Sequence, residues 1–195
     1  MAALKEWAVI CKALEDGKQT ILLRKGGILE YRDGFQIKHN VFLLYPTFEH
    51  QSIKYIKSSY HNKLDSEYMN TISREKNVIS IIAKVELVKE VQNPHSLSQI
   101  DKYHIWNENF IETRMKYNPN KSMSVLLLRV YRLPENLFVT ERKEWTGCKS
   151  WIDIDIPNCA NSLVGKNSED EQMCKPVIDD LEFQKISYEF GREWR

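Results

Sequence analysis

Residues 113–134 form the stretch that most limits how this chain can fold. They contain no acid, five basic side chains and two tyrosines, and they lead into the apolar run Val125-Leu126-Leu127-Leu128. A short, continuous apolar run of this kind is typical of a strand that is buried on both faces. We therefore predict a buried strand over residues 123–133, ended by Pro134, with a basic and aromatic segment before it.

Other segments also predict strands. Residues 78–91 carry apolar side chains at alternate positions, which predicts a long strand. Asp16-Gly17 separates two apolar runs and predicts a tight hairpin turn, although the apolar spacing of residues 4–11 also fits a helix. Shorter strands are predicted at residues 28–31, 35–37, 41–45 and 145–156.

Helical spacing appears in two places. Residues 52–64 carry apolar side chains three or four positions apart, which predicts a helix. Residues 177–194 predict a C-terminal helix with acids in its first turn, where the helix dipole favours them. The chain is therefore expected to be α+β, with a bent mixed sheet or small β-barrel and flanking helices. We predict a single domain over residues 1–195, comprising a core at about 2–156, an irregular linker at 157–176 and the helix.

Composition argues against several classes of protein. No apolar run approaches the ~20 residues that cross a bilayer, and charges interrupt residues 1–14, unlike a signal peptide. The four cysteines and five histidines are scattered without the spacing of a metal site. We expect a cytoplasmic protein with no metal, no cofactor and no membrane partner.

The net charge of +1 conceals an uneven distribution. Residues 1–152 carry 23 Lys and Arg against 17 Asp and Glu, whereas residues 153–195 carry 5 against 10. A basic surface attracts the phosphates of nucleic acids, although a run of charge is more often only a solvated face. Trp145 and Trp151 flank Gly147 and Lys149, and an exposed indole can stack on a base, although such a pair can equally lie in the core.

Enzyme chemistry has only weak signals. Arg24-Lys25-Gly26-Gly27 could cradle a phosphate but lacks the spacing of a nucleotide-binding loop. Asp16-x-Lys18 and Glu141-x-Lys143 match a fragment of metal-dependent nucleases, and three-residue matches are common in a charged chain. A nuclease or other hydrolase would need acids and a histidine to gather in one pocket, namely among Glu49, His50, Glu86, Asp153 and Asp155. A protein-interaction module using the acidic tail is a further alternative.

Several blocks resemble the bacterial, especially cyanobacterial, DUF1802 family of unknown function. They include Leu4-Lys5-Glu6-Trp7-Ala8-Val9, residues 21–28, residues 42–51, Leu128-Arg129-Val130-Tyr131-Arg132-Leu133 and residues 147–151, and they cover almost the whole chain. Some members look to be joined to restriction-endonuclease-like domains, which implies a role near restriction or defence. The order of the predicted elements also resembles PUA-like barrels of the ASCH and EVE types, which implies RNA or modified bases as ligands.

The function we predict is nucleic-acid binding, DNA or RNA, with recognition of a modified or extruded base and a restriction-type nuclease as partner. No catalytic motif is present in the sequence. The candidate site residues are Arg24, Lys25, Lys54, Lys57, Arg114, Lys116 and Lys121 for phosphates, and Tyr45, His50, Gln51, Trp145, Lys149 and Trp151 for the base.

Overall fold

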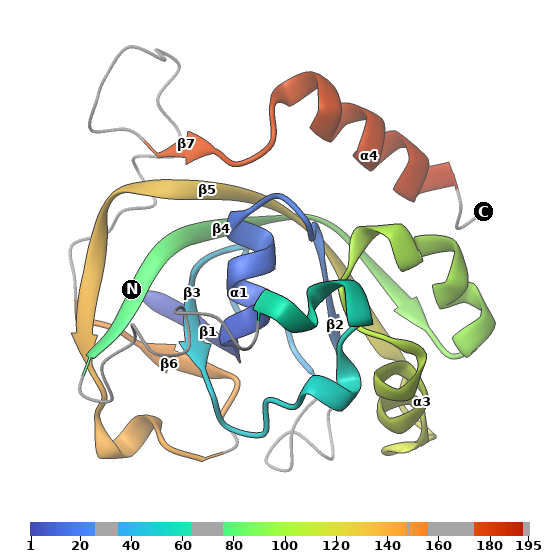
Figure 1. Cartoon of the computed structure of the whole chain (residues 1–195), viewed down its shortest axis with the longest axis horizontal. Helices are drawn as coiled ribbons and strands as arrows, with labels where there is room; N and C mark the ends of the chain where they lie inside the picture. Colours follow the sequence, from blue (N-terminus) through green and yellow to red (C-terminus); the bar gives the residue numbers. More distant parts are fainter. Residues whose placement is uncertain (26–34, 64–75, 148, 156–173, 193–195) are drawn as a thin grey trace.

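The computed structural model describes residues 1–25, 35–63, 76–147, 149–155 and 174–192. It shows a mixed sheet of seven strands with helices around it, as Figure 1 shows. The strands are β1 (Ala2–Trp7), β2 (Ile21–Arg24), β3 (Val41–Thr47), β4 (Lys76–Val91), β5 (Met123–Thr140), β6 (Trp151–Asp153) and β7 (Lys175–Pro176). The helices are α1 (Ala8–Glu15), α3 (Glu108–Lys116) and α4 (Asp180–Arg192), with 3-10 helices η2 (Ile53–Tyr55), η3 (Ser58–Lys63), η4 (Pro94–Tyr103) and η5 (Lys143–Trp145).

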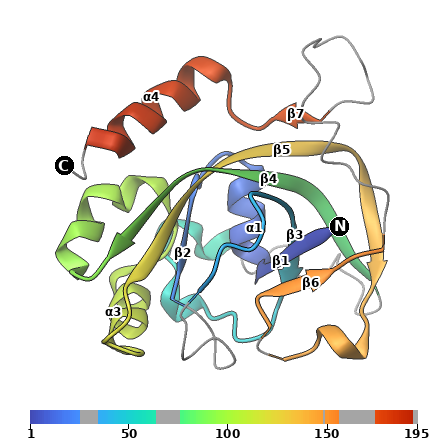
Figure 2. The ribbon, with the colours of Figure 1, turned by 180° about the vertical axis from the view of Figure 1, so that it is seen from behind.

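The sheet has the order β2-β5-β4-β3-β1-β6, and β7 adds to β5. β1 and β3 are parallel, whereas the other pairs are antiparallel. The pairing of β4 with β5 has irregularities between Ile79 and Ile81 and between Val85 and Leu87, and such bulges bend a strand pair. In Figures 1 and 2, β4 and β5 arch over α1, with β1 and β3 on its other side. The α+β fold with a bent mixed sheet and flanking helices, predicted from the sequence, is confirmed.

Apolar side chains lie on both faces of the central strands. Leu4 and Leu44 belong to a large buried cluster around α1, whereas Ala3 and Leu43 belong to a second, smaller cluster. Burial on both faces explains why β1, β3 and β5 read as nearly continuous apolar runs. Among the described residues, every helix is too short or too polar to cross a bilayer.

The hairpin predicted around Asp16-Gly17 is wrong, because the segment before the turn is helix α1. Six of its eight residues are buried, so the run is apolar enough to resemble a buried strand, although its spacing also fits the helix that forms. Gly17 ends the helix with a φ of 67°, in the left-handed region that glycine adopts readily. Asp16-Gly17 therefore terminates a helix instead of joining two strands.

Three other predicted boundaries change. β5 continues past Pro134 to Thr140. Its pairing with β4 passes from Arg132 directly to Leu137, so Pro134 lies where the ladder requires no N–H. The helix predicted at 52–64 is replaced by η2 and η3, and among the described residues of the strand predicted at 145–156 the part that pairs as a strand is Trp151–Asp153.

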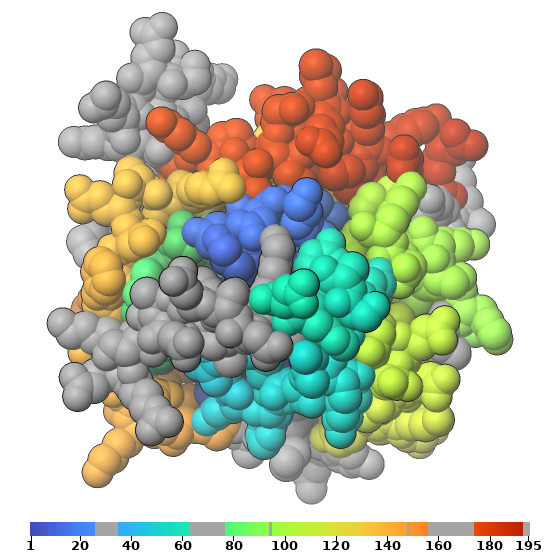
Figure 3. Space-filling model, in the orientation of Figure 1, coloured from blue at the N-terminus to red at the C-terminus, as the bar shows by residue number. Residues whose placement is uncertain are grey.

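Some predicted segments lie partly or wholly outside the described residues. The strand predicted at 28–31 and most of the linker at 157–176 lie outside the described residues, and residues 35–37 are not a strand. The C-terminal helix is present as α4 and begins at Asp180. In the space-filling view of Figure 3, α4 lies along one edge of the molecule, beside η4. Glu189 accepts hydrogen bonds there from Lys102 and Tyr103, at 2.6 and 2.7 Å.

Candidate functional site

A cleft of about 400 Å³ opens where the curled sheet is not closed. It is lined by residues of β1 and β2, of β3 and the segment after it, of η2 and α3, and of the segment 147–150. β2 stands at one end of the strand order and β1 lies near the other end, so no ladder joins them. The lining residues are Lys5, Glu6, Trp7, Leu23, Arg24, Thr47, Glu49, His50, Tyr55, Trp106, Phe110, Thr113, Arg114, Tyr117, Gly147, Lys149 and Ser150.

An ion pair bridges β1 and β2 across this opening. Arg24 Nη1 lies 3.0 Å from Glu6 Oε2 and 3.4 Å from the carbonyl oxygen of Lys5. The other carboxylate oxygen of Glu6 accepts the N–H of Trp7 at 2.8 Å. Both carboxylate oxygens of this buried side chain thus have partners, which offsets the cost of removing the charge from water.

Aromatic rings form one wall of the cleft. Trp7 stacks on Tyr55 with centroids 6.1 Å apart, and it meets the edge of Phe110 at 5.6 Å. Trp106 stacks on Phe110 at 5.0 Å with the ring planes only 9° apart. Trp106 Nε1 is buried and has no hydrogen-bond partner within the described ranges. Trp7 and Tyr55 are half-buried, so they are the rings of this wall that keep surface available for stacking, whereas Phe110 and Trp106 are buried behind them.

Basic side chains surround the aromatic wall. Arg114 is half-buried on α3, four positions after Phe110, with its guanidinium 5.7 Å from the centroid of Tyr117. Lys149 is exposed and donates to the carbonyl oxygen of Glu144 at 2.7 Å. Arg24, at the end of β2, also lines the cleft. The cleft thus brings together side chains that attract anions and rings that stack on planar groups.

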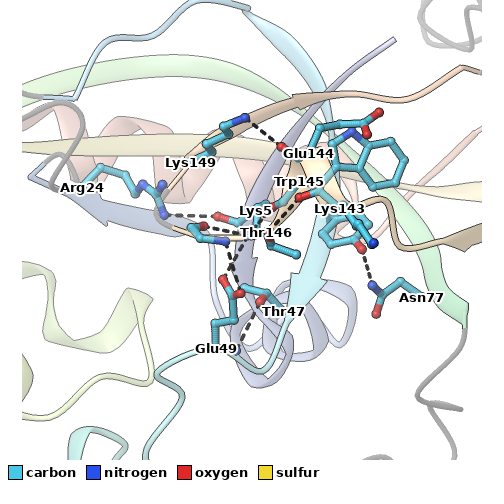
Figure 4. A network of polar contacts seen from close by, with 12 residues as sticks. Lys5, Arg24, Thr47, Glu49, Asn77, Lys143, Glu144, Trp145, Thr146 and Lys149 are labelled. Atoms are coloured by element: carbon cyan, nitrogen blue, oxygen red, sulfur yellow. Dashed lines mark hydrogen bonds and ion pairs between the residues drawn. The ribbon is translucent and has the colours of Figure 1, made fainter.

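The buried ammonium of Lys5 holds part of the cleft lining together through the hydrogen bonds drawn in Figure 4. Its Nζ donates to Glu49 Oε2 at 3.0 Å and to the carbonyl oxygens of Trp145 and Gly147 at 2.8 and 3.0 Å. Burial opposes the charged form of Glu49, but the hydrogen bond and charge of Lys5 outweigh it, so the pKa of Glu49 is lowered. His50 follows with a φ of 61°, an uncommon backbone conformation for a residue other than glycine. Lys5 therefore ties β1, the segment after β3 and the segment after η5 into one rim.

Four of the thirteen predicted site residues line the cleft: Arg24, His50, Arg114 and Lys149. Three others are buried in the fold. Lys25 Nζ donates to the carbonyl oxygen of Met115 at 2.7 Å, and burial, helped by the charge of Arg114, lowers its pKa. Tyr45 and Trp145 pack edge to face in the smaller core cluster, and burial raises the pKa of Tyr45 to about 12.

The remaining six predicted residues lie outside the lining. Gln51 Oε1 accepts the N–H of Val9 at 2.9 Å, and so caps α1, because Trp7 at its N-cap has no side-chain oxygen. Lys57 donates to the carbonyl oxygens of Asp101 and His104 at 2.7 and 2.8 Å.

Trp151 is half-buried against Phe35 and Phe42, and its Nε1 donates to the carbonyl oxygen of Gln36 at 3.0 Å. Lys54 lies over the ring of Tyr55, Lys116 pairs with Glu112, and Lys121 follows α3.

Most of the aromatic wall and the Lys5–Glu49 pair were not predicted from the sequence. The sequence contains one indication that Lys5 and Glu6 have partners in the fold. The two charges interrupt an apolar run, and charges inside a buried strand require partners. Tyr55 lies in η2 and Phe110 in α3, with Tyr117 at the end of α3, and no local pattern relates these segments to Trp7.

An active site of the type considered above does not form among the described residues. Glu49 and His50 share the cleft, whereas Glu86 pairs with Lys84 at 2.9 Å on β4 and Asp153 lies in β6. No group of three or more His, Cys, Asp or Glu side chains suited to a metal ion occurs in the ranges that the structure describes.

Comparison with known proteins gives one family and one set of structures. The model of the family described as "Domain of unknown function (DUF1802)" matches residues 3–189. No curated protein matches this sequence. The crystal structure of ASCH from Zymomonas mobilis is similar at 13% identity and a TM-score of 0.40, over 73% of this chain and 88% of that chain. A tyrosine-to-phenylalanine mutant of the same protein is similar at 12% identity and a TM-score of 0.39, over 96% of both chains. ASCH is one of the two PUA-like types that the order of the sequence elements resembles.

Proposed function

The chain belongs to the DUF1802 family, and we propose that it binds single-stranded nucleic acid and holds one unstacked base in the cleft. The supporting observation is that Trp7, Tyr55 and Phe110 share one space with Arg114 and Lys149. Aromatic faces stack on any base, each stacked base contributing ~1–3 kcal/mol, while cations attract the phosphates. A ligand that is both planar and anionic suits both the aromatic rings and the basic side chains of the cleft.

The size of the cleft favours an unpaired base. About 400 Å³ is within the range of sites that enclose a small ligand. One nucleotide is a ligand of that size, whereas a paired base within a duplex cannot reach the aromatic wall without leaving its stack. We therefore expect single strands, or duplexes from which a base is extruded, to bind better than an intact duplex.

The proposal includes two finer points that follow from the family resemblance. The extruded base carries a modification, and a restriction-type nuclease acts as partner. Strands that differ by one modified base test the first point. Co-purification with a restriction-type nuclease from a cell that encodes both proteins tests the second.

Binding is measured by fluorescence anisotropy with a labelled RNA decamer, the matching DNA decamer and the matching duplexes, at several salt concentrations. Arg114→Ala and Lys149→Ala are expected to weaken binding to every strand, because they remove phosphate contacts. Lys185→Ala is the matched control, since this exposed residue lies on α4, which is far from α3 in both Figures 1 and 2. Absence of binding at low salt, or equal losses for all three variants, would show that the cleft is not a nucleic-acid site.

A further inference from the structure

Two carboxylates line the cleft, and that of Glu49 is the more accessible to a ligand. Glu6 is buried and accepts a short hydrogen bond on each oxygen, from Arg24 and from the N–H of Trp7. In Glu49, Oε2 accepts from Lys5, while among the described residues Oε1 has only the distant N–H of Gly147, at 3.4 Å. A carboxylate has about four lone-pair positions, so Glu49 keeps capacity for at least two further donors.

The carboxylate of Glu49 is held in place before any ligand arrives. Lys5 has a side chain only 5% exposed, and its other two hydrogens are used by the carbonyl oxygens of Trp145 and Gly147. The N–H of Glu49 donates to Thr47 Oγ1 at 3.2 Å, which fixes the backbone of the same residue. The side chain of Glu49 itself is 41% exposed and lines the cleft. The site therefore presents an oriented, charged acceptor and loses little conformational freedom on binding.

The pairing edges of the four bases differ in how they meet a carboxylate. Guanine presents two adjacent donors, the ring N1–H and the 2-amino group, which match the two oxygens of a carboxylate. Adenine and cytosine place a ring acceptor beside their amino group, and uracil and thymine place a carbonyl on each side of their single N–H. An oriented carboxylate therefore attracts guanine with two charge-assisted hydrogen bonds and repels an acceptor of every other base.

The same cleft also has donors for the guanine O6 atom, which lies next to the ring N1–H. The hydroxyl of Thr47 and the imidazole of His50 both line it. A donor beside the two oxygens of the carboxylate complements the order acceptor, donor, donor along the pairing edge of guanine.

We propose that the cleft selects guanine, and that Glu49, held by Lys5, is the residue that determines this specificity. The inference rests on the proposed function, since the base must enter the cleft before its edge can be recognised. A good bidentate pair discriminates between bases by about 10- to 100-fold, which is the preference we expect.

The test uses strands of five nucleotides in which only the central position carries a base and the others are stable abasic analogues. All strands then have the same phosphates, so differences in affinity report the base alone. Guanine is expected to bind about 10- to 100-fold more tightly than adenine, cytosine or uracil. Hypoxanthine, which keeps the ring N1–H and lacks the 2-amino group, is expected to fall between.

Glu49→Gln is the decisive variant, because an amide replaces one acceptor oxygen with a donor at nearly the same size. It is expected to bring the four affinities to within about threefold of one another. Glu86→Gln is the control, since Glu86 also pairs with a lysine, at 2.9 Å, but lies on β4 outside the lining. The ratio between bases is measured on one protein sample, so a change in the folded fraction cancels.

The outcomes separate this inference from the proposed function. Equal affinity for all central bases, a preference for another base, or a guanine preference that survives in Glu49→Gln would overturn the inference, while salt-sensitive binding of ordinary strands would still support the proposed function. Failure to bind any strand, with or without bases, would overturn both.

Discussion

His104 is expected to make the stability of this protein depend on pH, and the structure gives the magnitude. The side chain is 2% exposed and lies behind the aromatic wall, with its ring centroid 5.7 Å from that of Trp106. Burial, followed by the charge of Lys57, lowers the pKa of His104 from 6.5 to about 4. Asp101 opposes this effect only in part.

The sign follows from proton binding. Between pH 6.5 and about pH 4 the unfolded chain binds a proton at His104 and the folded chain does not. Stability is therefore complete above pH 6.5 and is lost as the pH falls toward about 4. A difference of about 2.5 pH units at about 1.4 kcal/mol per unit gives a loss of about 3 kcal/mol, with a slope of at most about 1.4 kcal/mol per pH unit.

Urea unfolding of the native protein and of His104→Gln at half-unit steps from pH 4.5 to 7.5 measures this loss. The difference in unfolding free energy between the two proteins is expected to shrink by about 2–3 kcal/mol as the pH falls across this window, because glutamine does not titrate. His95→Gln, at an exposed position in η4, is the control and is expected to leave the slope unchanged. A difference that stays constant with pH would refute the reasoning, even if His104→Gln is less stable at every pH.

Three further substitutions test how the site is supported. Gln51→Ala removes the acceptor for the N–H of Val9 at the start of α1, and urea unfolding is expected to show a loss of about 1 kcal/mol. Phe190→Ala empties a position of α4 that is fully buried against Tyr103, so the free energy of unfolding is expected to fall by ~3–5 kcal/mol; a smaller loss would mean that α4 is loosely held. Trp151→Ala is expected to lower the melting temperature through lost contacts with Phe35 and Phe42, while the anisotropy affinity for a decamer stays unchanged. A loss of affinity without a loss of stability would instead place Trp151 in the binding site.

The long strands could be predicted from the sequence, whereas the first helix could not. β4 alternates along much of its length, and β3 and β5 are apolar runs, so their patterns match strands directly. α1 has six of its eight residues buried, so its short apolar run fits both a helix and a buried strand, and Asp16-Gly17 favoured the strand. The prediction that the strand ends at Pro134 was wrong, because a proline ends a strand only where the neighbouring strand needs a backbone N–H at that position.

The cleft was only partly predictable because charge patterns do not reveal partners. Lys25 and Lys57 lie in basic segments, yet both direct their ammonium groups to backbone carbonyls of neighbouring elements. Lys5 was overlooked although a lysine in a buried strand must find several acceptors, and those acceptors are about 140 residues away in the chain. Only the curl of the sheet brings β1 next to residues 145–147.

The same distinction between structural and exposed cations determines how strongly salt affects binding. If all seven cations predicted from the sequence contacted phosphates, the slope of log affinity against log salt for a single strand would be about −5, at about −0.7 per contact. Arg24 is paired with Glu6, and Lys25 and Lys57 are bonded to carbonyls, so these side chains would have to break existing contacts to reach a phosphate. Arg114 and Lys149 both line the cleft and are the two cations to which the proposed function assigns phosphate contacts, and two contacts predict a slope of about −1.4. Anisotropy titrations across a tenfold range of salt distinguish the two values, and a slope near −5 would show that the strand follows a basic surface beyond the cleft.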